Sequence, residues 1–408
     1  MNASSPPPSR VVIIGAGPAG LMAAEQLADH GHAVTVYDQM PSVARKFLMA
    51  GRGGLNLTHS EPRDAFEGRY GAARDQVSDW LNDFDAADLR RWADGLGAET
   101  FIGSSGRVFP KVMKASPLLR AWLARLADKG VSIRTRSRWT GWHGDALAFE
   151  TPEGTLETTA EAVILALGGA SWAKLGSDAA WVPWLQARGG QVNPFQPANV
   201  GFETEWSSLL TDRFAGAPLK NIAISFDDHT ARGEAILSAY GLEGGAIYAL
   251  SARLREAIAR DGEAWVQLDL RPDQSAEDLA AKLAKPRGKN SLSNHLRKVL
   301  HLDGAFAALL REAGPLPEEP LALARRIKSV SVSLKAPRPL ERAISAAGGI
   351  ARDQYDRDLM LKTLPGVFVC GEMLDWEAPT GGYLLQACFA SGVRAANGVS
   401  RYLVNAKA

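Results

Sequence analysis

The feature that most constrains the fold is a glycine motif near the N-terminus. The stretch "VVIIGAGPAGLMAAEQL" (residues 11–27) places Gly15, Gly17 and Gly20 in the spacing G-x-G-x-x-G, between a short β-branched run and an amphipathic segment. The first glycine permits a tight turn, the second lets the backbone approach a pyrophosphate, and the third lets the helix pack closely on the strand. The motif therefore predicts a strand, a turn and a helix whose N-terminus faces phosphate groups.

The residues around the motif complete a βαβ unit. Residues 10–14 are expected to form a buried strand, residues 18–30 a helix, and residues 33–37 a second strand. Asp38 closes that second strand. A carboxylate at this point accepts hydrogen bonds from the adenosine ribose and repels a 2′-phosphate, which disfavours NADP. We therefore predict a bound dinucleotide.

Length, charge and cysteine content limit the class of protein. The chain has 408 residues, so two or three domains are expected. The formal net charge is +1, with no field of one sign for nucleic acid or an anionic membrane. Two cysteines argue against a secreted disulfide framework, and the chain has neither zinc-type spacing nor an apolar run of transmembrane length. The start, "MNASSPPPSR", is expected to be a short disordered tail rather than a signal peptide. We expect a cytoplasmic enzyme without a metal site.

The pattern of predicted strands and helices changes in the middle of the chain. The stretches "PLKNIAISF", "GEAILSA" and "AWVQLDL" read as strands, mostly without helices between them, and residues 275–310 as helical. The outer segments read as α/β, with a β-meander before Thr159 and a buried strand "AVILALGG". The predicted fold is thus α/β, with a Rossmann-like nucleotide domain (parallel sheet plus β-meander), an inserted antiparallel β-barrel-like domain and a small helical domain. The expected bounds are 10–190 with 345–408 for the first, 191–271 with 327–344 for the second, and 272–326 for the third.

Two further glycine clusters favour FAD over NAD. The stretch "KFLMAGRGGLNLTHS" (residues 46–60) is a glycine-dense loop with Arg52, Asn56 and Thr58 as donors. Such a loop can wrap a ligand that extends beyond the pyrophosphate. In the second cluster (residues 366–392), a strand ends at Gly371 and a helix is expected to begin near Tyr383. That helix N-terminus would favour the negative charge of a reduced flavin.

Several segments together carry a family resemblance. They are "GAGPAGLMAA", "RKFLMAGRGGLNLTHSE", "GRVFP", "ALGGASWAKLGSD", "GEAILSAYGLEGGAIYALS" and "GEMLDWEAPTGGYLLQACFASG". The chain resembles, from Arg10 to about Tyr402, the BaiN/RdsA-type NAD(P)/FAD-dependent oxidoreductases, aminoacetone-oxidase-like flavoproteins of the glutathione-reductase superfamily. The resemblance implies tightly bound, non-covalent FAD, an FAD domain built from both chain ends and a barrel-like middle domain. The chain departs from many relatives at Leu55, Leu384, Trp376 and Pro379, so the substrate is not carried over.

The resemblance also implies which residues contact FAD. These are Gly15, Gly17, Gly20, Asp38, Lys46, Arg52, Asn56, Gly169, Glu372 and the helix start with Gly381, Gly382, Tyr383, Leu384 and Gln386. The predicted cofactor site further includes Pro18, Ala19, Gln39, Arg45, Gly51, Gly53, Gly54, Leu57, Thr58, Trp139, Gly168 and Gly371.

No catalytic residue is assigned, and three candidates stay open. His59 is an acid or base near neutral pH, although a hydrogen bond to the backbone is favoured for it. Lys46 either holds a flavin oxygen or is a solvated surface charge. The Tyr383 hydroxyl either lies near the flavin pyrimidine or only packs. A wall formed by Trp172, Trp181, Trp184 and Trp376 is a further possibility for a hydrophobic substrate. Nothing activates Cys370 or Cys388, so disulfide-reductase chemistry is not supported.

The leading functional hypothesis is an FAD-dependent oxidoreductase. It would move a hydride between flavin and a small organic substrate, and NAD(P)H or O₂ would recycle the flavin. No second G-x-G-x-x-G unit occurs in residues 190–340, so NAD(P)H would visit only transiently. The alternatives are an amine oxidase that produces H₂O₂, and a flavin-containing protein that modifies or binds RNA. An NAD-dependent dehydrogenase is disfavoured because the loop at Lys46 would then lack a ligand. The oligomeric state is not predicted.

Overall fold

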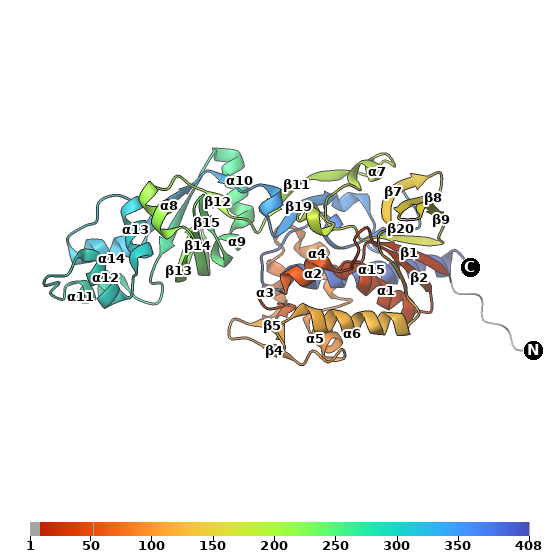
Figure 1. Cartoon of the computed structure of the whole chain (residues 1–408), viewed down its shortest axis with the longest axis horizontal. Coiled ribbons are helices and arrows are strands. Elements are labelled where there is room, and N and C mark those ends of the chain that lie inside the picture. Colours follow the sequence, from red (N-terminus) through yellow and green to blue (C-terminus); the bar gives the residue numbers. More distant parts are fainter. Residues whose placement is uncertain (1–8, 52, 408) are drawn as a thin grey trace, which may run out of the picture. The chain divides into compact units, whose positions relative to one another are not determined.

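The computed structural model describes residues 9–51 and 53–407 (Figure 1). The expected N-terminal tail and Arg52 lie outside the described residues. The chain divides into two units, one formed by the residues up to Gln196 together with those from Ser345 onward, and the other by Pro197–Ile344. Each unit has its own cluster of buried hydrophobic side chains.

The centre of the first unit is a five-stranded parallel sheet. Its strands, in spatial order, are β20 (Val367–Val369), β10 (Ala162–Leu165), β1 (Arg10–Ile14), β2 (Ala33–Tyr37) and β6 (Ser132–Arg134). The first strand of the chain is therefore central, with Ile13 opposite both Ile164 and Val36. Successive strands are added on either side of β1, so the topological switch point lies between β1 and β10. This arrangement confirms the predicted Rossmann-like fold.

Helices from both chain ends pack together in this unit. The helices are α1 (Pro18–Asp29), α2 (Arg45–Ala50), α3 (Arg63–Gly68), α4 (Arg74–Leu81), α5 (Ala86–Asp94), α6 (Ala115–Asp128), α7 (Val182–Gln186) and α15 (Tyr383–Asn405). A Cβ on Gly392 of α15 would lie 2.4 Å from the carbonyl oxygen of Ala19 in α1. The missing side chain thus lets the two helices approach each other closely, and the long C-terminal helix completes the N-terminal motif.

Three small sheets complete the first unit. The predicted β-meander is present as β7 (Arg138–His143), β8 (Ala146–Thr151) and β9 (Gly154–Thr158). A second sheet has the order β3 (Thr58–His59), β5 (Arg107–Pro110) and β4 (Thr100–Ile102). A third pairs β11 (Val192–Ala198) with β19 (Ser345–Ile350), which joins the two segments where the chain leaves and re-enters the unit. Because β11 pairs with β19, the unit boundary falls a few residues beyond the expected bound at 190.

The second unit is built on a seven-stranded antiparallel sheet. Its strands, in spatial order, are β17 (Val330–Leu334), β16 (Ala264–Asp269), β13 (Ala217–Phe226), β14 (His229–Ser238), β15 (Gly241–Glu243), β12 (Phe202–Glu203) and β18 (Ala336–Pro337). The two edge strands β17 and β18 are separated in the chain by Lys335 alone. The sheet must therefore curl until its two edges meet, which makes it barrel-like, as predicted.

Helices fill the rest of the second unit. They are α8 (Ser208–Phe214), α9 (Gly245–Tyr248), α10 (Ser251–Asp261), α11 (Ala276–Leu283), α12 (Leu292–Leu300), α13 (Gly304–Glu312) and α14 (Pro320–Lys328). α11, α12 and α13 form the segment predicted to be helical at residues 275–310, interrupted at the stretch "KPRGKNS". α14 lies beyond that segment and was not predicted as a helix of its own. The sequence pattern missed α9 and α10, which separate β15 from β16. Their first turns are rich in small residues, and this obscured the helical periodicity.

Candidate cofactor site

The three glycines of the N-terminal motif differ in their surroundings. A Cβ on Gly15, whose φ is +106°, would lie 2.2 Å from the carbonyl oxygen of Ala166. A Cβ on Gly20 would lie 2.0 Å from the carbonyl oxygen of Gly15. A Cβ on Gly17 would meet no protein atom within 4 Å. Gly15 and Gly20 are therefore required by packing, whereas Gly17 borders open space at the start of α1.

The N-terminus of α1 is available to an anion. Gly17 is its N-cap, Pro18 occupies the first turn, and no side chain caps the helix. The first turn also carries no acidic side chain. Unsatisfied N–H groups and the helix dipole together favour a phosphate at such a position.

Asp38 fixes the glycine turn from the end of β2. Its carboxylate accepts hydrogen bonds from the backbone N–H groups of Ala16 and Met40, each at 2.8 Å. Burial raises the pKa of Asp38, and these two hydrogen bonds and the nearby Arg45 oppose that shift. A carboxylate has about four acceptor positions, so Asp38 retains capacity for a ligand hydroxyl.

Lys46 joins three segments at the carboxyl edge of the sheet. Its Nζ lies 2.6 Å from Glu372 Oε2 and 3.1 Å from Ser171 Oγ. Glu372 belongs to the turn after β20, and Ser171 to the loop after β10. The sequence analysis missed Ser171, although the switch-point rule directs attention to the residues that follow β10.

The loop after β10 contacts the segments that follow β2 and β20. Gln39 Nε2 donates to the carbonyl oxygen of Gly176 at 3.0 Å. Trp181 Nε1 donates to the carbonyl oxygen of Gly168, which has a φ of +74°. A Cβ on Gly169 would lie 3.2 Å from the carbonyl oxygen of Glu372. The predicted residues Gln39, Gly168 and Gly169 are thus brought together with the glycine motif.

The glycine-rich loop after α2 is tied to the strand β5 and the turn that follows it. The N–H groups of Leu55 and Leu57 donate to the carbonyl oxygens of Met113 and Val108, each at 2.9 Å. Gly54 has a φ of +124°, and a Cβ there would collide with Met113 Cε at 2.8 Å. Asn56 Oδ1 is buried and has no hydrogen-bond partner among the described residues. A buried acceptor without a partner is costly, so it fits a site for a ligand donor.

The start of α15 packs against the same loop. Gly382 caps the helix with a φ of +96°, and a Cβ there would lie 2.5 Å from Thr58 Cα. Gln386 accepts a hydrogen bond from Thr58 Oγ1 at 2.8 Å and donates to the carbonyl oxygen of Phe84 at 2.9 Å. Gln386, a predicted FAD contact, is fully buried and its amide serves to position the loop against α15.

A polar cluster surrounds Tyr383. The Tyr383 hydroxyl donates to Glu61 Oε1 at 2.7 Å, and Arg69 donates to both oxygens of Glu61 at 3.1 and 2.8 Å. Burial raises the pKa of Tyr383, and the hydrogen bond to Glu61 adds to this. Burial also raises the pKa of Glu61, but the bonds from Arg69 and Tyr383 outweigh it and hold that pKa below its ordinary value.

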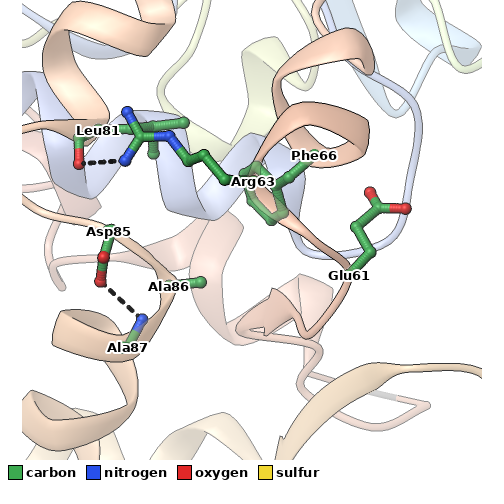
Figure 2. A pocket seen from close by; sticks show the side chains of 7 residues that line it. All are labelled: Glu61, Arg63, Phe66, Leu81, Asp85, Ala86 and Ala87. Carbon is green, nitrogen blue, oxygen red and sulfur yellow. Dashed lines mark hydrogen bonds between the residues drawn. The ribbon is translucent and has the colours of Figure 1, made fainter.

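Glu61 also lines a small pocket. The pocket has a volume of about 180 Å³ and is lined by Glu61, Arg63, Phe66, Leu81, Asp85, Ala86 and Ala87 (Figure 2). Figure 2 shows Arg63 reaching the carbonyl oxygen of Leu81 and Asp85 bound to the N–H of Ala87. Asp85 satisfies the first turn of α5 through a capping box, so this helix terminus is already occupied.

His59 is held by the backbone on both sides of its ring. Its Nδ1 accepts from the N–H of Glu61 at 3.2 Å, and its Nε2 lies 3.0 Å from the carbonyl oxygen of Ser105. The ring stacks on Tyr383 with 5.5 Å between centroids. Both nitrogens are engaged, which is the arrangement that the sequence analysis favoured for His59 over catalysis.

The tryptophans of the proposed wall pack on different aromatic partners. Trp139 is buried on β7 and contacts Trp184 with 5.1 Å between ring centroids. Trp181 contacts Phe195, and Trp376 contacts Trp80. Trp181, Trp184 and Trp376 all belong to or pack against the hydrophobic core of the first unit, and a substrate wall stays a prediction. Trp139 Nε1 is buried without a partner among the described residues. Two residues earlier, the backbone N–H of Ser137 donates to the carbonyl oxygen of Asp38, so Trp139 follows a segment that is bound to the end of β2.

The residues present fit a dinucleotide that carries a flavin. Gly17 leaves space at an uncapped helix N-terminus, and the N-terminus of α15 also has no side-chain cap. Buried and unpartnered Asn56 Oδ1 and Arg45 Nε, both within the described residues, add an acceptor and a donor between these helices. The structure brings together the predicted residues of the glycine motif, Asp38, Gln39, Lys46, the loop from Gly53 to Thr58, and Glu372; Arg52 lies outside the described residues.

Other chemistries find less support. Cys370 and Cys388 are free and buried, and burial raises the pKa of both thiols. Within residues 9–51 and 53–407, no three His, Cys, Asp or Glu side chains gather as a metal site would require. Over the same residues, no helix combines the length and apolar character needed to cross a membrane.

Comparison with known proteins identifies the family. A model described as "HI0933-like protein Rossmann domain" matches residues 9–398. This chain belongs to that HI0933-like family. Relatives include the 3-dehydro-bile acid delta(4,6)-reductase of Clostridium scindens, 25% identical over 94% of this chain and 97% of the relative. The ribosomal RNA dihydrouridine synthase of Escherichia coli is 23% identical over 93% of this chain and 95% of the relative.

A solved structure shows a similar fold. The 3-ketosteroid delta1-dehydrogenase from Sterolibacterium denitrificans aligns with a TM-score of 0.53 at 12% identity, over 97% of this chain and all of that chain. The family match confirms the resemblance to the BaiN/RdsA-type proteins. It also confirms the predicted class, so this HI0933-like chain is an enzyme, a flavoprotein oxidoreductase.

Proposed function

We propose that this HI0933-like enzyme binds FAD non-covalently along the carboxyl edge of its parallel sheet and moves a hydride between the flavin and a small organic substrate. The observation that carries the proposal is the space at Gly17, at the uncapped N-terminus of α1 and close to Asp38, which accepts from the N–H of Ala16. Packing requires Gly15 and Gly20 but does not account for Gly17. Close approach of a pyrophosphate to the backbone would account for it.

The roles of the chain's residues follow from their positions. The first turn of α1 would hold the pyrophosphate, and Asp38 the adenosine ribose. Glu372, held by Lys46, would accept hydroxyls of the linking chain, and Asn56 with the N-terminus of α15 would face the ring system. The flavin supplies the hydride chemistry, and the protein supplies orientation and electrostatics.

The proposal also covers the electron donor, NAD(P)H, and the class of substrate, an unsaturated organic compound. The second unit has an antiparallel sheet in place of a second nucleotide fold, so NAD(P)H would bind only transiently at the flavin. The relative from Clostridium scindens is a reductase, which supports reduction of an unsaturated compound over oxidation of an amine. The shortage of cysteines supports a cytoplasmic location.

The test begins with the purified protein. Denaturation should release FAD, identified by its chromatographic retention and spectrum, at close to one per chain. Anaerobic NADPH or NADH should then bleach the visible flavin band. Peroxide formed from an amine in air, without bleaching by either nucleotide, would replace the reductase by the amine oxidase. A colourless protein that also fails to take up FAD would refute both.

An RNA substrate is the second candidate, and one observation favours it. Residues 279–302 contain six Lys or Arg and no Asp or Glu, although the whole chain has a net charge of only +1. Of these, Lys285, Arg287 and Lys289 are exposed in the connection between α11 and α12. Such a segment can contact RNA phosphates, and the relative from Escherichia coli is a ribosomal RNA dihydrouridine synthase.

A binding assay separates the two candidates. An RNA-acting enzyme should bind ribosomal RNA fragments at low salt. The double variant Lys285→Gln with Lys289→Gln should weaken that binding. The slope of the logarithm of the binding constant against the logarithm of the salt concentration should become less steep by about 0.7 for each phosphate that the variant no longer neutralises. Lys111→Gln with Lys114→Gln, which alters an equal charge in the first unit, serves as the control. Equal binding by both double variants would reject this second candidate.

A further inference from the structure

Exposed apolar side chains are concentrated in one short segment. Among the large hydrophobic residues exposed in the described part of the chain, four lie within residues 101–113. They are Phe101, Ile102, Val112 and Met113, with exposed fractions of 43%, 48%, 55% and 36%. The others are scattered singly along the chain, as is normal on protein surfaces. A concentration of this kind marks an interaction surface.

The segment is an ordered hairpin. Phe101 of β4 lies opposite Phe109 of β5, with 5.9 Å between their ring centroids. Figure 1 shows β4 and β5 at the periphery of their unit. Met113 follows the hairpin, and its carbonyl oxygen accepts from Leu55 in the glycine-rich loop. Because neighbouring strand residues point to opposite faces, Phe101 and Ile102 are exposed on the two faces of the hairpin. The four apolar side chains are held on this hydrogen-bonded scaffold beside the proposed cofactor site, and we call them the hairpin patch.

The charged residues within and just after the hairpin patch are all basic. Residues 100–127 contain five Lys or Arg and no Asp or Glu. Arg107, Lys114 and Arg120 are exposed, whereas Lys111 pairs with Glu99 at 2.5 Å. The balanced charge of the whole chain gave no reason to expect a membrane partner. The run of cations in residues 100–127 does give one for this segment.

We propose that the hairpin patch docks this enzyme on an anionic membrane surface. Exposed aromatic and aliphatic side chains insert at the lipid boundary, while neighbouring cations contact anionic headgroups. A second copy of the chain is a poorer occupant, because a twofold interface through this patch would bring the cations of both copies together. The patch is also a projecting hairpin, and small-molecule sites are concave. The proposal does not depend on which substrate the flavin site takes.

Vesicle flotation of the full-length protein tests the proposal. The probes are vesicles of phosphatidylglycerol mixed with phosphatidylcholine, and vesicles of phosphatidylcholine alone. Wild type should float with the first and not with the second, and added salt should weaken the association. Ile102→Ser with Val112→Ser should reduce the partition coefficient about tenfold, and Lys114→Gln with Arg120→Gln should also reduce it several-fold.

A matched control isolates the patch. Val404, at the end of α15, is 67% exposed and lies outside the patch, so Val404→Ser should float like wild type. Thermal melting and FAD content, unchanged in every variant, would show that folding is intact. The proposal fails if wild type ignores anionic vesicles at low salt, or if Val404→Ser loses as much binding as the patch variants. It also fails if the patch variants instead abolish a dimer in solution, because the patch would then join two copies.

Discussion

At the scale of single residues, Gly17 and Gly20 provide a matched pair of substitutions. A methyl group on Gly17 meets no protein atom within 4 Å, whereas one on Gly20 would overlap the carbonyl of Gly15. We expect Gly17→Ala to fold with wild-type stability, within about 0.5 kcal/mol, and to bind FAD at least about tenfold more weakly. Gly20→Ala should lose about 2 kcal/mol of stability or more. Urea unfolding of the FAD-free proteins and FAD titration would measure the two effects. Wild-type FAD affinity in Gly17→Ala would contradict the placement of the pyrophosphate.

Glu61 is expected to make stability depend on pH. Its pKa is lowered in the folded protein by Arg69 and Tyr383, against the effect of burial. The stabilisation is therefore complete above the unfolded pKa of about 4.3 and is lost as pH falls through the lower folded value. At pH 7, Glu61→Gln should cost about 1–2 kcal/mol. The cost should shrink below about pH 4.

Parallel urea unfolding at both pH values checks the sign of this effect. Glu157→Gln is a suitable control, because Glu157 is a more exposed carboxylate on β9 that pairs with the side chain of His143 rather than with an arginine. A cost for Glu61→Gln that stays constant across the range would show that its hydrogen bonds act without its charge.

The residues that the sequence could place are those whose neighbours are local. Gly15 and Gly17 belong to one βαβ unit, so their spacing alone predicted the tight turn. Asp38 was predicted only as a ribose acceptor, and its hydrogen bonds to the N–H groups of Ala16 and Met40 came from the structure. The pair Lys46–Glu372 could not be derived from spacing, because 326 positions separate the partners and only the fold joins them. The same holds for Glu61 and Tyr383, which meet across the packing of α15 against the loop after β3.

At the scale of elements, the capping box of α5 gives a direct prediction. Asp85 accepts from the N–H of Ala87 (Figure 2). It also accepts from the N–H of Asp88, and Asp88 in turn accepts from the N–H of Asp85. Asp85→Ala should destabilise the first unit by about 1 kcal/mol, and Asp85→Asn should cost less because asparagine also caps helices well. Urea midpoints compare the two. Equal losses would mean that the charge of Asp85, rather than its cap, is what matters.

The elements that the sequence predicted best were those with a strong period or clear boundaries. The β-branched strands of the parallel sheet and the helix α1 after the glycine motif were found this way. The sheet of β3, β4 and β5 was not predicted, because its strands are only 2, 3 and 4 residues long. Short strands gain their stability from pairing with distant neighbours, and a local pattern does not reveal those partners.

At the scale of the whole molecule, the second unit is expected to fold by itself. Pro197–Ile344 is a continuous segment with its own buried core. The two edge strands of its sheet, β17 and β18, follow each other in the chain with Lys335 alone between them. Expressed alone, it should show dispersed amide signals and one cooperative unfolding transition in urea. The matched control is the first unit with a short linker across the gap, which should be the fragment that retains FAD. A second unit that unfolds without cooperativity would show that it needs the rest of the chain.

The discontinuous first unit also dictates an order of events during synthesis. β20 and α15 leave the ribosome after the whole second unit, yet β20 is a strand of the central sheet and α15 packs against the glycine motif. The nascent chain therefore carries an incomplete nucleotide fold while the second unit is being made. We expect a chain that stops before α15 to take up no flavin, so that colour would appear only after α15 has been translated.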